Sequence, residues 1–191
     1  MMIPILLCSL VGVTVVIERL IFFYNSRTIA EADRMLTLIQ QGKYIDALSL
    51  AEQRPSPLLR VLSAGILSRT DQPGKAMEAV ALAELAQMKR GLTILDTIIT
   101  LGPLLGLLGT IIGMIDAFGI MAESGLGQPH AVTGGVAEAL VCTAAGIFVA
   151  VAALVPYNYF LNRVEQEGDR IELYATRFEA ALAAVSRNRH Q

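Results

Sequence analysis

The sequence predicts an all-α integral membrane protein with three transmembrane helices. Of its 191 residues, 54% are hydrophobic and 17% are charged, a balance that soluble domains of this length rarely have. The apolar residues gather in three uncharged runs, at 1–17, 97–115 and 139–162. A spanning helix needs roughly 20 apolar residues, and a helix satisfies its own backbone hydrogen bonds in lipid. The three runs therefore predict three helical spans.

The first run predicts a retained transmembrane helix over 1–23 rather than a signal peptide. It has no basic segment at its start, and no small-x-small cleavage site follows it. The leucine before Cys8 also differs from the small residue expected in a lipoprotein cleavage box. Because Cys8 and Cys142 both fall inside predicted spans, we interpret them as packing residues and not as a disulfide.

Lysine and arginine predict which side of the membrane each connection faces. The segment 24–90 carries nine of them, the tail from Arg163 carries five, and 117–136 carries none. By the positive-inside rule, a domain over 24–91 and the tail over 162–191 are cytoplasmic. The N-terminus and a short loop over 119–133 are then periplasmic. The net charge of −2 favours neither nucleic acid nor a polybasic membrane patch.

The domain over 24–91 is predicted to be helical. Apolar periodicity and turn residues delimit helices over 28–42, 43–54 and 56–69. A strong helix-forming stretch then begins at Lys75. Only Gly91 interrupts it before the second span, over 92–118, so we expect one long helix that runs from the cytoplasm into the membrane.

The third span, over 134–161, is expected to continue into a cytoplasmic helix. Val164, Ile171, Phe178 and Val185 recur at intervals of seven, with polar residues between them. A heptad pattern of this length favours packing either against neighbouring chains or on the chain's own domain, and the sequence leaves both open.

Small residues are regularly spaced in the second and third spans. In lipid, such residues let helix backbones approach closely. We expect tight helix contacts within one chain or between copies, and the presence of two such seams favours an oligomer. The seam residues are Gly102, Gly106, Gly109 and Gly113 in the second span and Ala139, Gly146 and Ala153 in the third.

Glu138 stands near the start of the third span, and no further charge follows until Arg163. An acid at the centre of a membrane helix costs roughly 2.5–3.5 kcal/mol, and such residues tend to mark ion pathways. The alternative is an interfacial position at the helix N-terminus, where negative charge is favoured. Thr143 lies five residues further, about 140° around the helix, so the two side chains do not share a face.

The second span also carries threonines at positions 93, 97 and 100. This stripe is compatible with a narrow wet pore, but a threonine hydroxyl in a membrane helix often bonds the backbone one turn back. We interpret the stripe in this second way.

Two stretches carry a family resemblance. “LDTIITLGPLLGLLGTIIGMIDAF” and “GVAEALVCTAAGIFVAVAALVPYNYF” resemble two helices of the ExbB/TolQ/MotA family, the proton-channel subunits of energy-transducing motors in bacterial inner membranes. The order of the spans matches as well. Members of the ExbB and TolQ branches have three spans and MotA has four, which disfavours a MotA-like role.

Two features depart from the family pattern. The chain has “AVAALVP” where the family often has “AIPA”, so its proline falls later, at Pro156. It also begins without the extension that many ExbB members carry, so the choice between ExbB and TolQ stays open.

The resemblance implies that Thr110, Glu138 and Thr143 line or gate a proton route. It also implies a homopentamer whose second and third spans surround a central pore. A single-span subunit of the ExbD/TolR type, in two copies, would present an essential aspartate within that pore. A TonB- or TolA-like protein and membrane lipid are the other implied partners.

The implied function is that of a non-enzymatic channel and stator subunit, without cofactor or metal. It would couple the proton-motive force to TonB-dependent uptake across the outer membrane. The alternatives are a TolQ-type role in outer-membrane integrity and cell division, and a non-conducting membrane scaffold.

Overall fold

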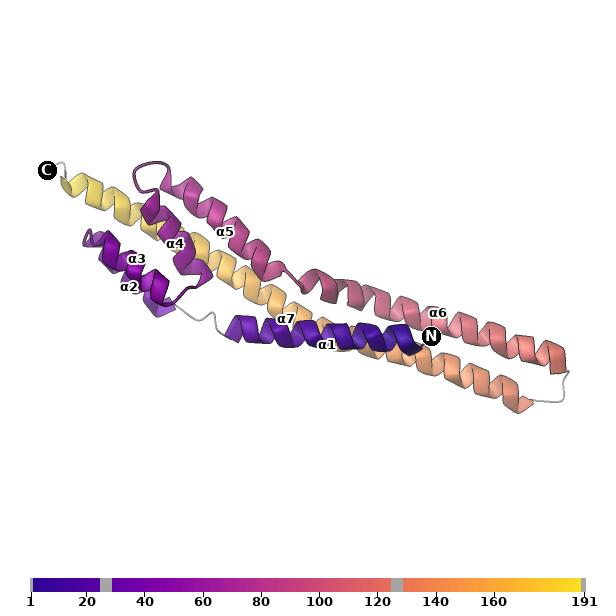
Figure 1. Cartoon of the computed structure of the whole chain (residues 1–191). Coiled ribbons are helices and arrows are strands. Elements are labelled where there is room, and N and C mark those ends of the chain that lie inside the picture. The colour runs from indigo at the N-terminus through magenta and orange to yellow at the C-terminus, as the bar shows by residue number, and fades with distance from the viewer. Residues whose placement is uncertain (1, 25–28, 125–128, 190–191) are drawn as a thin grey trace. The chain divides into compact units, whose positions relative to one another are not determined.

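The computed structural model describes residues 2–24, 29–124 and 129–189, and these residues are almost entirely helical (Figure 1). No strand occurs among them, which confirms the predicted all-α class. The helices are α1 (Met2–Tyr24), α2 (Ile29–Gln40), α3 (Tyr44–Gln53), α4 (Pro57–Leu67), α5 (Pro73–Lys89), α6 (Leu92–Ser124) and α7 (Pro129–Arg189).

Three helical stretches are long and apolar enough to cross a membrane, as the sequence predicts. They are α1, the stretch that contains α6, and the apolar part of α7. The second and third spans are expected to end at 118 and to begin at 134. Helix α6 instead continues to Ser124, and α7 begins at Pro129. Most of the segment 119–133, expected as a loop, is therefore helical. Pro129 suits this start, because the first residue of a helix needs no N–H donor.

The chain divides into two compact units. Residues 1–20 and 91–160 form the first, which we call the membrane unit. Residues 21–90 and 161–191 form the second, which we call the polar unit. Helix α7 contributes to both units.

The expectation of one long helix from the polar stretch into the second span is wrong. Helix α5 ends at Lys89, and α6 begins at Leu92. Gly91 between them has φ of +86°, a left-handed conformation that glycine adopts at little cost. Gly91 also packs under Arg19, whose Nε would lie 3.2 Å from a Cβ at this position. Both its backbone angle and its close neighbour thus favour glycine here.

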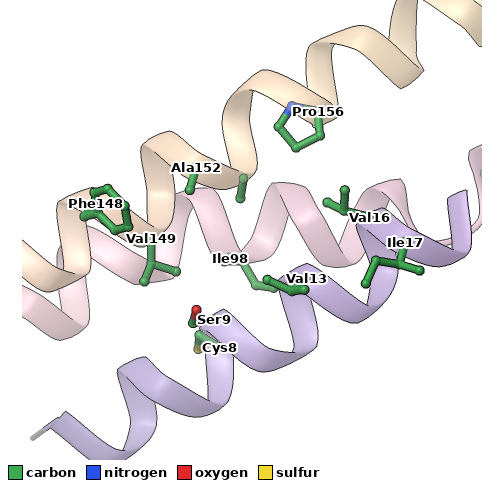
Figure 2. A pocket seen from close by; sticks show the side chains of 12 residues that line it. Cys8, Ser9, Val13, Val16, Ile17, Ile98, Phe148, Val149, Ala152 and Pro156 are labelled. Atoms are coloured by element: carbon green, nitrogen blue, oxygen red, sulfur yellow. The ribbon is translucent and has the colours of Figure 1, made fainter. Parts of the chain in front are cut away.

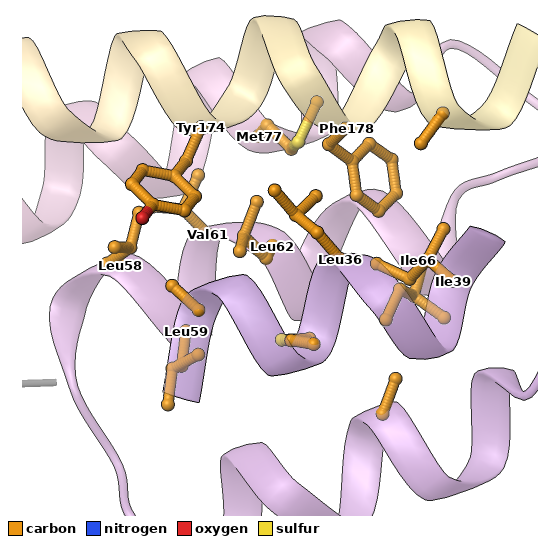
Figure 3. Close-up of a cluster of buried hydrophobic side chains, with 14 of the residues drawn as sticks. Leu36, Ile39, Leu58, Leu59, Val61, Leu62, Ile66, Met77, Tyr174 and Phe178 are labelled. Carbon is orange, nitrogen blue, oxygen red and sulfur yellow. The ribbon is translucent and has the colours of Figure 1, made fainter. Parts of the chain in front are cut away.

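The polar unit has a core of large apolar side chains, shown in Figure 3. Leu59, Leu62 and Ile66 of α4 are fully buried, and Phe178 of α7 is buried among the same cluster. The tail residues that recur at sevens therefore pack on the chain's own domain. For Ile171 and Phe178, which belong to this core, the structure decides between the two interpretations of the heptad pattern; Val164 is buried as well.

A polar contact joins α2 to α7 within the polar unit. The Tyr174 hydroxyl donates a hydrogen bond to Asp33 Oδ1 over 2.8 Å. Arg177 Nη1 lies 3.8 Å from the same oxygen, and its guanidinium lies over the Tyr174 ring. Burial of Tyr174, and next its hydrogen bond to Asp33, raise the pKa of the phenol above 10.0.

Candidate functional site

The candidate site lies along α6 and α7 of the membrane unit, where small residues bring the two backbones together. A Cβ at Gly102 would lie 2.8 Å from the carbonyl oxygen of Gly146, and one at Gly113 would lie 2.8 Å from the Cβ of Ala139. Gly146 in turn faces the backbone of Gly106. The two seams therefore face each other within one chain, so this contact by itself requires no second copy.

The remaining seam residues lie beside cavities. Gly109 lines a groove between α6 and α7, next to Ala139. Ala153 is 6% exposed and lines a hollow of about 170 Å³, into which α1, α6 and α7 project side chains (Figure 2). Cys8 lies at this hollow, whereas Cys142 lines the groove, and both are free thiols.

Thr143 links the two helices of the seam directly. Its hydroxyl donates a hydrogen bond to the carbonyl oxygen of Gly106 over 2.9 Å. The approach depends on glycine, because a Cβ at Gly106 would lie only 3.0 Å from the Cα of Thr143. The predicted site residue Thr143 therefore holds α7 against α6.

Thr110 faces a different part of the surface. Its hydroxyl donates to the carbonyl oxygen of Leu107 over 2.6 Å, and it lines a shallow hollow with apolar residues of α6 alone. The interpretation of the threonine stripe is confirmed for two members. Thr97 donates to the carbonyl of Thr93, and Thr100 donates to that of Asp96.

Glu138 is exposed on the groove between α6 and α7, which encloses about 390 Å³. The residues beside it are mostly glycine, alanine and isoleucine, with the carboxylate of Asp116 as the other acid of the groove. One chain therefore does not bring the three predicted residues to one point. Thr143 lies in the seam, Glu138 at one flank, and Thr110 in a separate hollow.

Asp116 is the groove residue that sequence reasoning missed. The signal in the sequence was the end of the second uncharged run at position 115. Among the residues that the structure describes, no group of three or more His, Cys, Asp or Glu side chains could hold a metal ion.

Two closely packed apolar helices, with two acids on the groove between them, define the chain as a helical membrane protein. Comparison with known proteins identifies the family. The model of the MotA/TolQ/ExbB proton channel family matches residues 53–173. This chain therefore belongs to the MotA/TolQ/ExbB proton channel family.

The named relatives include ExbB-like, ExbB and TolQ proteins. The putative biopolymer transport protein ExbB-like 1 of Synechocystis sp. is 34% identical over 200 residues, covering 100% of this chain and 78% of the relative. The biopolymer transport protein ExbB of Xanthomonas campestris is 36% identical over 94 residues, covering 49% of this chain and 37% of the relative. The Tol-Pal system protein TolQ of Pseudomonas aeruginosa is 34% identical over 117 residues, covering 58% of this chain and 51% of the relative.

Proposed function

We propose that this chain is the proton-conducting stator subunit of a motor in the bacterial inner membrane. It couples the proton-motive force to work on the outer membrane and acts without enzymatic catalysis. The observation that carries this proposal is the exposure of Glu138 on the groove between α6 and α7. A carboxylate beside two apolar spans is costly in lipid, so it requires water, a proton or a partner.

In the proposed assembly, five copies surround a pore lined by their second and third spans. Two copies of an ExbD/TolR-like single-span subunit occupy that pore and supply an aspartate. The N-terminus is periplasmic and the C-terminus is cytoplasmic, which the distribution of lysine and arginine supports. Since Thr110 and Glu138 lie apart in one chain, a route that uses both passes between neighbouring copies.

Each polar residue has a distinct role in this proposal. The Glu138 carboxylate accepts and releases the proton. Thr110 offers a hydroxyl on the wall of the route, and Thr143 keeps α6 and α7 in register through its bond to Gly106. One proton that crosses 100 mV supplies about 2.3 kcal/mol, so mechanical work on a TonB- or TolA-like protein needs several protons.

The favoured cellular role is in TonB-dependent uptake, because a relative that aligns with all of this chain carries an ExbB-like name. The second candidate is a TolQ-type role in outer-membrane integrity and cell division, which the TolQ relative supports over 58% of this chain. Deletion of the gene for this chain distinguishes the two cellular roles. Loss of an ExbB-type subunit impairs uptake of iron complexes, whereas loss of a TolQ-type subunit makes the outer membrane leak.

Glu138→Ala tests whether the chain conducts or only scaffolds. A conducting subunit with this substitution assembles, as native mass spectrometry of the complex would show, but does not restore function to a deletion strain. Glu138→Asp is the matched control, since it keeps the carboxylate and is expected to retain part of the function. Full complementation by Glu138→Ala would contradict the proposal and favour a scaffold.

A further inference from the structure

We propose that Asp116 is a second proton-carrying residue, paired with Glu138 across the groove between α6 and α7. This inference rests on the proposed function and extends it from one acid to two. Both side chains are exposed on the same groove, one from each helix. Asp116 belongs to neither the glycine seam nor the threonine positions, so packing does not account for it.

The register of the two helices places the acids on the same flank of the seam. Ala117 and the seam residue Ala139 lie where the two helices touch, and they are 1% and 2% exposed. Asp116 and Glu138 each precede one of these alanines by one residue, a rotation of about 100° from the contact line. In an antiparallel helix pair, equal rotations of the same sign fall on the same side. The shared groove agrees with this geometry.

The acids also lie at nearly the same depth along the helices. Gly113 packs against Ala139, and Gly135 packs against Ala117. Position 116 is therefore level with position 136, two residues from Glu138. Two residues correspond to about 3 Å along the helix axis. The two acids therefore face the same stretch of the groove.

The surroundings leave the pair without a fixed positive charge. The segment 91–162 contains no lysine or arginine, and the groove is lined by Gly, Ala, Ile and Cys apart from the two acids. Apart from His130, opposite charge in this segment must therefore come from protons or from a partner.

The proposed step conserves charge within the pair. The O–H bond of the Asp116 carboxylic acid breaks, and its proton binds a carboxylate oxygen of Glu138. Asp116 becomes the carboxylate, and Glu138 becomes the neutral acid. Asp116 is then ready to accept the next proton, while Glu138 passes its proton onward.

The test is proton flux into liposomes that hold the chain with its single-span partner, under an imposed potential. Asp116→Asn keeps the shape of the side chain but removes its acid. Flux is expected to fall about a hundredfold, the lower end of what a positioned proton acceptor contributes. Asp116→Glu should restore it. Asp96→Asn is the matched control, because Asp96 is an exposed acid on the same helix outside the groove.

The outcomes separate this inference from the proposed function. Wild-type flux in Asp116→Asn, with flux lost in Glu138→Gln, would overturn the inference and leave the proposed function standing. Wild-type flux in Glu138→Gln would overturn both. A loss in Asp116→Asn that Asp116→Glu does not restore would indicate a positional role and also overturn the inference. If Asp116→Asn does not assemble by native mass, Asp116→Ser provides the same comparison with a smaller side chain.

Discussion

In the membrane unit, α6 and α7 meet through glycine, alanine and one threonine, whereas in the polar unit α4 and α7 meet through Leu62, Ile66 and Phe178. The same helix, α7, takes part in both contacts. Its small residues are concentrated before position 160, and its large buried side chains, such as Phe160 and Phe178, lie from that position onward.

The difference follows from the solvent around each unit. In water, burial of apolar area contributes roughly 25 cal/mol per Å², so large side chains are the efficient way to join helices. Lipid gives little of this driving force, and close backbone packing with interhelical hydrogen bonds takes its place. The bond from Thr143 to Gly106 and the close approach of Gly102 to Gly146 are contacts of this second kind.

The largest expected effect comes from emptying the core of the polar unit. Phe178→Ala removes a fully buried ring and should lower the free energy of unfolding by about 3–5 kcal/mol. Hydrogen exchange in the full chain would measure this as loss of protection in α2, α4 and α5, with little change in α6. Leu173→Ala is the control on the same helix, since Leu173 is 50% exposed. Equal losses in both variants would contradict the assigned core.

A smaller effect is expected from a methyl group in the seam. A Cβ at Gly146 would contact the backbone of Gly102 and Gly106, which cannot rotate away. Gly146→Ala should therefore destabilise the membrane unit by about 1–3 kcal/mol. Unfolding in mixed detergent, followed by circular dichroism, would report it.

Gly134→Ala provides the control for the seam, because a Cβ there has no neighbour within 4 Å. Alanine is the better helix former, so this variant should be neutral or slightly stabilising. A loss of stability as large as that in Gly146→Ala would show that the seam does not hold the two helices.

The hydrogen bond across the seam should contribute less. Thr143→Val keeps the size of the side chain and removes its donor to Gly106. The expected loss is about 0.5–1.5 kcal/mol, and the same detergent titration would detect it. Thr143→Ser retains the hydroxyl and should recover most of the loss. If Thr143→Val is as stable as wild type, the hydrogen bond from Thr143 to Gly106 does not contribute to stability.

The smallest effect is a pH dependence in the polar unit. Because the pKa of Tyr174 is raised in the folded chain, its contribution to stability is complete below pH 10.0 and is lost as the pH rises through the folded value. Tyr174→Phe should therefore flatten the alkaline fall in stability. Tyr44→Phe, in the same unit, should keep the wild-type profile. Identical profiles in all three proteins would count against the buried, hydrogen-bonded environment assigned to Tyr174.

Much of the fold could be predicted because its signals are local. Runs of apolar residues predict the three membrane helices, and glycine spacing predicts that α6 carries a close-packing face. The break at Gly91 could not be predicted in this way. A single glycine is tolerated within a helix, and its left-handed φ depends on its surroundings, including Arg19.

The candidate site could be predicted only in part, because it depends on the register between two helices. Spacing alone separated Glu138 from Thr143, and the structure places them in the groove and the seam. The partner of Thr143 and the groove shared by Asp116 and Glu138 both require the alignment of α6 with α7. Asp116 ends an apolar run, so the sequence alone marks it only as a boundary.

Proton flux in liposomes that contain the chain and its single-span partner tests the central claim most directly, by comparison of wild type with Glu138→Gln. The account predicts potential-driven flux in wild type and its loss in the variant, while native mass spectrometry finds the same complex in both. Equal flux in the two proteins, with intact complexes, would show that the groove acid does not carry the proton.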